Sequence, residues 1–549
     1  MDKSSPTTIP NGEYWSLLGD SDEIHDDQIA YSTSSLYPVA WMRPLDNMIT
    51  TAEEILGTKL VEPLRSPLLP AYITEMSEST SQEDIDYLAR KGVFEIPDMV
   101  LRNELLVTFV RNVHPYMPLL DISPFIDAIE NNGQSNKISL LLLHAVMFSS
   151  AAFIEAGNRD PEWHVSRKQS RLEFYEKAKI LYNFDMETDP IVLIQTVLLL
   201  TYWHESPDDP KDARYWLGIG ISFAISIGLH CEPDPSLTPA TQRLRRRLWW
   251  CLYTRDRLIA FTLRQVPMIK DDDQSVSLLT IDDFEFVDFT RSGADLTGQI
   301  GFKVPQSNHY QRQWAQIFIE KMKFCTIVSQ AIAVACSNLL TECDSLETCD
   351  MRLDSWNAAL PTGVHYQPPT YLEISEAEKS LLAYKAWLRI LFLAAKSLLR
   401  RIKSSISGKN VPNTALLQDV ADLQTQDSIQ AITNITESLD STESIHYLPT
   451  TAVALLLPVI TVHVFNIRSG NSDLWTAGFR SFHCCLKALE KLAKIYIIAE
   501  SVVHFLESAM CGNKLGREVN GIWPKTPRLF EKVLTDAELK SFHRIIGYG

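Results

Sequence analysis

The chain has 549 residues and a formal net charge of −17 at pH 7, and 45% of its residues are hydrophobic, which is ordinary for a folded protein. Only 21 residues are glycine, too few for the many special turns of a multi-stranded β protein, so the composition favours an all-α fold. The acidic balance argues against a protein that coats nucleic acid through a basic surface, because neutralising phosphates requires lysine and arginine.

The cysteines indicate neither a metal site nor a disulfide framework. All nine lie after residue 230, and no two have the C-x-x-C spacing. An odd number at irregular spacing is typical of a reduced intracellular protein. The sequence therefore predicts no structural zinc and no other cofactor. The N-terminus has no basic flank followed by an apolar stretch, so no signal peptide is expected.

Residues 1–80 are expected to form a disordered acidic segment. Their first thirty residues contain seven acidic side chains and one lysine, with Trp15, Leu17 and Leu18 scattered among them. Acidic residues interleaved with bulky apolar ones resemble a transcriptional activation segment. A solvated tail has the same composition, and this plainer interpretation is favoured.

From residue 81 onward, apolar spacing and capping residues predict helices joined by short loops. Ser123–Pro124, Asp189–Pro190 and Thr238–Pro239 each place a capping side chain before a proline, which suits the first turn of a helix. Gly228, followed by Pro233, is a typical stop. The predicted helices span residues 81–92, 99–113, 123–131, 138–154, 167–182, 190–203, 213–227, 238–263, 311–340, 376–403, 414–440, 450–467 and 474–510.

One apolar stretch, residues 448–467, is long enough to cross a membrane. Pro449, Pro458 and His463 lie within it, and the mean hydropathy of the chain is slightly negative. A helix that is apolar on all sides is also what the core of a large helical protein requires. The sequence therefore predicts a buried core helix and no membrane span.

One short motif suggests catalysis. Asp208, Asp209 and Asp212 form a D-D-x-x-D run, with which all-α isoprenoid synthases hold magnesium around a diphosphate, since Mg²⁺ prefers carboxylate oxygens. Pro210 lies inside the run, where a helix does not tolerate it well, and no second ligand motif accompanies it. A polar loop is the favoured interpretation, and an isoprenoid-synthase-like enzyme is the alternative.

Two neighbouring segments carry opposite charges. Residues 241–270 contain eight basic side chains and one acid, Asp256, whereas residues 271–290 contain seven acids and no base. The basic segment could bind DNA or direct nuclear import, or the two segments could neutralise each other within the fold. The second interpretation is favoured, because arginines near aromatic residues often form interior ion pairs. Trp249, Trp250 and Tyr253 are expected to pack this helix into the core.

The same region resembles a known family. The stretch RLRRRLWWCLYTRDRLIAFTL (243–263), preceded by residues 212–230 and followed by PMIKDDD (267–273), is similar to the middle homology region of fungal zinc-cluster transcription factors. Upstream segments from residue 91 extend the similarity and point to the branch of the cutinase transcription factors. The family-motif residues, for which the resemblance implies structural roles, are Arg246, Arg247, Trp249, Trp250, Arg255, Asp256, Arg257 and Pro267.

The chain departs from the family pattern in three places. Cys231–Glu232 replaces an arginine and an acid, and residues 264–267 replace a Gly-Arg-Pro turn. Family members also begin with six cysteines that bind two zinc ions, and no cysteine precedes Cys231 here. The resemblance therefore implies transcription regulation without the family's own DNA-binding module.

These observations predict three parts: the acidic segment 1–80, a regulatory domain at 81–300, and a C-terminal helical region at 301–549 packed on it, in one large bundle-like body. The resemblance implies a nuclear transcription regulator of a fungal metabolic or secondary-metabolite pathway, and no enzyme. Expected partners are other transcription factors or coactivators and a small-molecule effector, with DNA contacted indirectly if at all and no membrane. The alternative is a non-DNA-binding co-regulator or inhibitor of a full-length family member.

Overall fold

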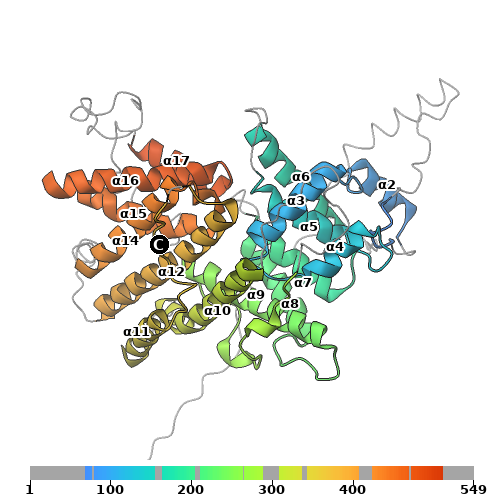
Figure 1. The fold of residues 1–549 in the computed structure, drawn as a ribbon, viewed down its shortest axis with the longest axis horizontal. Coiled ribbons are helices and arrows are strands. Elements are labelled where there is room, and N and C mark those ends of the chain that lie inside the picture. The colour runs from blue at the N-terminus through green and yellow to red at the C-terminus, as the bar shows by residue number, and fades with distance from the viewer. Residues whose placement is uncertain are drawn as a thin grey trace, which may run out of the picture. The chain divides into compact units, whose positions relative to one another are not determined.

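The computed structural model describes residues 69–76, 80–154, 163–203, 211–263, 265–287, 308–336, 343–371, 373–406, 423–468 and 472–510. Within these ranges the chain is built from helices (Figure 1), and its strand-like pairing is limited to one isolated bridge between Ile73 and Ile138. The prediction of an all-α fold is confirmed. Most of the segment predicted to be disordered, residues 1–80, lies outside the described residues.

The first half of the described chain, up to residue 287, consists of helices and short helical turns. They are α2 (Gln82–Arg90), α3 (Met99–Thr108), the π-helical turn η2 (Phe109–Val113), α4 (Ile122–Glu130), α5 (Leu140–Ala151), α6 (Trp163–Asn183), α7 (Pro190–Leu200), α8 (Ala213–Ser226), α9 (Pro239–Leu263), and the 3-10 turns η3 (Asp271–Asp273) and η4 (Ile281–Asp283).

A further set of helices and turns makes up the second half of the described chain. They are α10 (Asn308–Cys336), α11 (Cys343–Ala358), α12 (Glu376–Ile406), α14 (Leu423–Ser441), the 3-10 turn η5 (Ile445–Tyr447), α15 (Thr451–Arg468), α16 (Ser472–Ala493) and α17 (Ile497–Met510). The stretch predicted as one helix at 474–510 is two helices, because the chain turns at residues 494–496. Helix α11 is absent from the predicted set, although its buried residues Leu346, Cys349 and Leu353 have helical spacing.

Two of the three predicted helix starts are confirmed. The Asp189 carboxylate accepts a hydrogen bond from the Ile191 N–H at 2.8 Å, with Pro190 as the first residue of α7. The Thr238 hydroxyl likewise accepts from the Thr241 N–H at 3.2 Å at the start of α9. Local side-chain chemistry alone decides these two boundaries.

The third predicted start, at Ser123–Pro124, is wrong. Helix α4 begins at Ile122, and Asp121 is its N-cap residue. Ser123 and Pro124 therefore lie inside the first turn. A proline is tolerated there because the N–H groups of the first turn have no partner within the helix. The Ser–Pro pattern thus correctly predicted the first turn of α4, but it placed the N-cap at Ser123, two residues after the observed N-cap Asp121.

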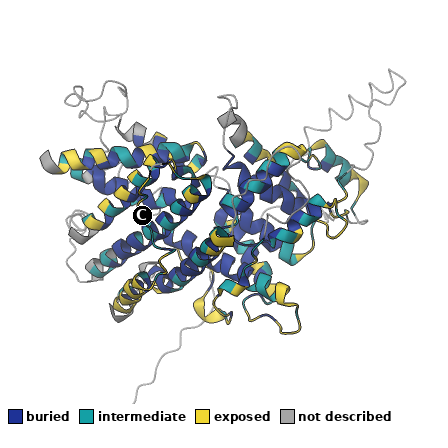
Figure 2. Cartoon of the chain, viewed as in Figure 1, coloured by how far each residue is buried: buried dark blue, intermediate teal, exposed yellow. Residues whose placement is uncertain are grey.

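Helix α15 lies in the stretch that was long enough to cross a membrane. Ten of its residues from Thr451 to Ile460 are buried or half-buried, and the helix contacts α16, α9, α12 and α14. The prediction of a buried core helix is confirmed (Figure 2). No helix within the described ranges combines the length and the apolarity that a membrane crossing requires.

Helix α9 connects the two halves of the described chain. It contacts α7, α8 and η4, which precede residue 300, and α10 and α15, which follow it. All fifteen residues from Arg247 to Phe261 are buried. A helix buried on every side must place its polar residues against partners inside the protein, and α9 contains four charged residues in this stretch.

Candidate functional site: the buried arginines of α9

The two tryptophans of α9 fasten the segment that follows the helix. Trp249 and Trp250 are each 1% exposed. The indole N–H of Trp249 donates to the Gln274 side-chain oxygen at 2.6 Å, and that of Trp250 donates to the Ser277 carbonyl at 2.9 Å. Buried indoles usually find such partners. Both rings therefore hold the 271–279 segment against α9 while filling the core.

Near the start of its buried stretch, α9 carries Arg246 and Arg247. Arg246 pairs with Asp283 at 2.8 Å and with Glu232 at 3.2 Å. Arg247 is 2% exposed, donates to the Asp283 carbonyl at 2.7 Å and pairs with Asp121. These contacts connect α9 to η4, to the loop after α8 and to the N-cap of α4.

About two turns before the end of α9, Asp256 and Arg257 form a buried ion pair. Both side chains are 1% exposed, and Arg257 Nη1 lies 2.5 Å from the Asp256 carboxylate. The same carboxylate accepts hydrogen bonds from the backbone N–H groups of Met268 and Ile269, at 2.9 and 3.0 Å. Burial raises the pKa of Asp256, and its N–H donors and Arg257 oppose that shift. Asp256 thus holds the turn that contains Pro267 against the helix.

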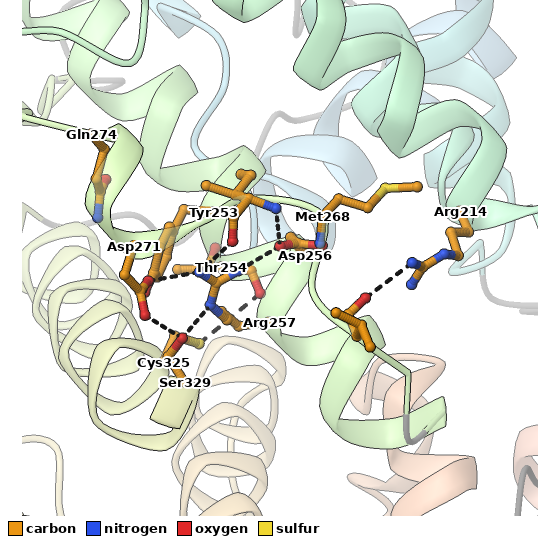
Figure 3. A network of polar contacts seen from close by, with 12 residues as sticks. Arg214, Tyr253, Thr254, Asp256, Arg257, Met268, Asp271, Gln274, Cys325 and Ser329 are labelled. Carbon is orange, nitrogen blue, oxygen red and sulfur yellow. Dashed lines mark hydrogen bonds and ion pairs between the residues drawn. The ribbon is translucent and has the colours of Figure 1, made fainter. Parts of the chain in front are cut away.

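Asp271 completes this network from outside the helix. Its carboxylate accepts from Arg257 Nη2 at 2.7 Å and from the hydroxyls of Tyr253 and Ser329, both at 2.6 Å (Figure 3). Burial alone would raise its pKa, but the hydrogen bonds from Ser329 and Tyr253 and the charge of Arg257 hold the pKa of Asp271 below its usual value. Ser329 belongs to α10, so the network joins α9 to the next helix.

Arg255 is the exception among these arginines. It is 5% exposed, and its Nε and Nη2 donate to the side chain and the carbonyl of Thr201, at 2.9 and 2.7 Å. Its guanidinium also lies 4.8 Å from the centre of the Tyr202 ring. Thr201 caps the C-terminus of α7, where the helix dipole favours a cation. No carboxylate in the described part of the chain pairs with Arg255, and burial lowers the pKa of Arg255.

The opposite charges of the two segments are partly paired inside the fold. Arg246 and Arg257 form ion pairs with Asp283 and Asp271, which confirms that interpretation for these residues. Other acids of the second segment are exposed: Asp272, Asp273 and Asp282. Arg264 and Asp288 lie outside the described residues. Arg247 finds its acid, Asp121, far upstream in the sequence.

The D-D-x-x-D run is described only at its last member. Asp212 is the N-cap of α8, and its carboxylate accepts from the Tyr215 N–H at 2.8 Å. Asp208 and Asp209 lie outside the described residues. Among the residues that the structure does describe, no three His, Cys, Asp or Glu side chains gather as they would to hold a metal ion.

A comparison with protein families assigns the central part of the chain. Residues 106–366, from α3 to the loop after α11, match the Fungal specific transcription factor domain. These residues are thus similar to a fungal specific transcription factor domain. Helix α9 and its arginine network lie within the matched residues, so the resemblance predicted from the sequence is confirmed in the region that carried it.

Curated relatives extend the similarity beyond that domain. Cutinase transcription factor 1 beta of Fusarium vanettenii is 31% identical over 492 residues, which cover 85% of this chain and 55% of that protein. Transcription factor cpaR of Aspergillus oryzae is 28% identical over 443 residues, covering 77% of this chain and 73% of that protein. The fusaric acid cluster transcription factor FUB12 of Gibberella fujikuroi is 26% identical over 285 residues, covering 51% and 40%.

These relatives are fungal transcription factors, as the resemblance implied. The chain spans only about half the length of the first of them. The similarity to Cutinase transcription factor 1 beta covers most of the present chain, and so it includes a large part of the residues after 366 that the domain match leaves out.

Several partners in the network carried no sequence signal. Thr201 is 54 residues and Ser329 is 72 residues from the arginine that each contacts. Thr201 is the C-cap residue of α7 and Ser329 is a polar residue within α10, and no local pattern marks either of them as the partner of an arginine. Glu232 was noted only as a departure from the family pattern, and it is the second acid that pairs with Arg246.

Proposed function

We propose that the chain regulates transcription in the nucleus of a fungal cell, within a metabolic or secondary-metabolite pathway. The single observation that carries this proposal is the fungal specific transcription factor domain at residues 106–366. The names of the relatives, which refer to cutinase and to a fusaric acid cluster, support the kind of pathway.

We further propose that these 549 residues regulate and do not themselves contact DNA. Phosphate contacts require accessible basic side chains. Arg247, Arg255 and Arg257 are buried, and Arg246 is paired with two acids. The sequence also contains no cysteine before Cys231. Promoters would then be reached through another transcription factor or a coactivator.

The eight family-motif residues have structural roles in this proposal. Arg246, Arg247, Asp256 and Arg257 hold the segments around α9 together, while the two tryptophans fill its core. In the same way, we propose that residues 81–300 and 301–549 act as one body, since α9 contacts α10 and α15. A signal received by the later helices would then reach the matched domain directly.

The test attaches the full chain to an unrelated DNA-binding domain and measures a reporter gene with matching sites. We expect reporter expression to change in either direction, and co-precipitation from nuclear extract to recover a zinc-cluster transcription factor. In parallel, the purified chain alone should give no sequence-selective DNA shift at physiological salt. An unchanged reporter together with selective DNA binding by the isolated chain would contradict the proposal.

We propose no catalytic activity. The capping contact of Asp212 gives that residue a structural role. Incubation of the purified chain with prenyl diphosphates and Mg²⁺ should therefore release no terpene. Product formation that is lost in Asp208→Ala would instead support the isoprenoid-synthase alternative.

A further inference from the structure

Five helices form the wall of an apolar cavity beside the end of α9. Its volume is about 160 Å³, and α9, α12, α14, α15 and α17 line it. Ile259, Leu398, Ile432, Leu457 and Val502 provide much of the wall. A cavity of about 150 Å³ with a similar lining accommodates one benzene ring. The space therefore suits a compact apolar group of that size.

The cavity also contains a buried positive charge. Arg255 lines it, and Thr201 engages only Nε and Nη2 of the guanidinium. In the described part of the chain, Nη1 donates to no acceptor and no carboxylate balances the charge. Burying a cation without a counterion is costly. An anion in the cavity would offset this cost, and Nη1 is the donor that it can use.

A second polar group in the wall lacks a partner as well. Thr450 directly precedes α15, is 6% exposed and lines the same cavity. Its hydroxyl has no hydrogen-bond partner among the described residues, although buried hydroxyls nearly always have one. The start of α15 adds the positive end of a helix dipole, which also favours an anion.

We propose that this cavity binds a small apolar monocarboxylate, a molecule of the size of benzoate. The carboxylate accepts hydrogen bonds from Arg255 Nη1 and from the Thr450 hydroxyl, and the hydrocarbon part fills the apolar wall. A phosphate group would bring two negative charges to one free guanidinium nitrogen and one hydroxyl, which is too few donors. A neutral ligand would leave the Arg255 charge unbalanced, and a cation would be repelled by it.

Binding at this place would join two parts of the molecule. Ile259 and Arg255 belong to the fungal specific transcription factor domain, while the other four helices follow residue 366. One bound ligand would therefore contact both. The binding itself does not depend on the proposed role in transcription, so the two proposals can fail separately.

The first experiment compares three probes by isothermal titration with the purified full chain: benzoate, benzyl alcohol and benzylamine. Charge-assisted hydrogen bonds are about twice as strong as neutral ones. We therefore expect benzoate to bind once per chain, about tenfold more tightly than benzyl alcohol, and benzylamine not to bind. Equal affinity for benzoate and benzyl alcohol, or no binding of benzoate, would overturn the proposal.

Two substitutions locate the ligand without touching Arg255, whose replacement could unfold the chain by uncapping α7. Ala454 is a half-buried residue of the wall, so Ala454→Phe should fill the cavity and abolish binding of both benzoate and benzyl alcohol. Thr450→Val should lower the affinity for benzoate several-fold. The matched control is Thr461→Val. Thr461 is equally buried, but it lies within α15 and its hydroxyl donates to the Leu457 carbonyl at 2.9 Å, so this change should leave benzoate binding unchanged.

A second, more polar cavity is the alternative site at which benzoate could bind. It is lined by Lys385, Arg389 and His365, among others, and has a volume of about 250 Å³. Benzoate binding that survives Ala454→Phe and disappears in Lys385→Ala would place the anion there and overturn the proposal. Benzoate binding that is lost in Ala454→Phe and retained in Lys385→Ala supports it, provided that thermal unfolding shows both variants to be folded.

Discussion

Arg255 and Arg257 are two residues apart on α9 and almost equally buried, yet their surroundings differ. Arg257 is surrounded by Asp256, Asp271 and Ser329, which accept from its Nε, Nη1 and Nη2 atoms. Arg255 contacts one threonine, the Tyr202 ring and the wall of an apolar cavity. A buried charge with matched partners fastens segments together, whereas a buried charge with a free donor is available to a ligand.

The largest expected effect comes from breaking the matched network. Arg257→Ala leaves the buried Asp256 carboxylate without its counterion and removes one donor from the half-exposed Asp271, so the free energy of unfolding should fall by about 3–5 kcal/mol. Urea denaturation of both proteins measures this. The control is Arg480→Ala, which removes an ion pair with Glu437 from an arginine that is 81% exposed and should cost less than about 1 kcal/mol. Equal losses in the two variants would refute the distinction.

A second expected effect concerns buried histidines, which are neutral in the folded chain because burial disfavours the protonated ring. Burial lowers the pKa of His144 to about 4 from 6.5, and its Nε2–H donates to the Val93 carbonyl at 2.8 Å. Between these two values the unfolded chain binds more protons than the folded one. Stability contributed by the neutral ring is therefore complete above pH 6.5 and is lost as the pH falls toward 4.

The size of this loss follows from the shift. It amounts to about 3 kcal/mol at pH 4 for His144 alone, and His446 and His463, whose pKa values burial also lowers to about 4, add to it. Denaturation between pH 7 and pH 4 should show a smaller slope in His144→Gln than in the wild type. Arg480 is 81% exposed and contacts none of these histidines in the described residues, so Arg480→Ala should leave the slope unchanged. Parallel curves for His144→Gln and the wild type would contradict the assignment.

Arg246 allows a test of the charge pattern at intermediate burial. Arg246→Glu places an acid between Asp283 and Glu232, and because Arg246 is 20% exposed we expect a loss of about 2 kcal/mol. Arg480→Glu makes the same charge change beside an exposed acid and should cost much less. A selective DNA shift by the wild type that disappears in Arg246→Glu, with melting temperature unchanged, would favour a DNA-binding surface instead.

Whether the sequence could predict a contact depends on how far apart in the sequence the two contacting residues lie. The starts of α7 and α9 were predictable, because Asp189 and Thr238 cap them within three residues. The opposite charges of 241–270 and 271–290 likewise indicated that the two segments pair, but not that Arg246 pairs with Asp283. Thr201 as the partner of Arg255 was not predictable, since the contact spans 54 residues and depends on how α7 packs against α9.

The cavity was beyond sequence reasoning for the same reason. Five helices line it, and no local pattern specifies the space that they leave. Thr450 looks like an ordinary capping threonine, and Arg255 looks like one more member of an arginine-rich helix. Only the packed structure shows that a hydroxyl and a guanidinium nitrogen without partners line one cavity.

The smallest expected effect has the opposite sign to the others. Thr450→Val removes a buried hydroxyl that has no partner, so the ligand-free protein should become more stable by about 1 kcal/mol. Thr461→Val removes a hydroxyl that bonds the Leu457 carbonyl, so it should give no gain. Thermal unfolding without and with benzoate measures both quantities. If Thr450→Val stabilises the ligand-free protein and weakens benzoate binding, then the unpaired hydroxyl lowers the stability of the fold and raises the affinity for the ligand. Such a trade-off is common for groups in binding sites. A loss of stability in Thr450→Val would mean that the hydroxyl caps α15, and the cavity would then lose one of its two donors.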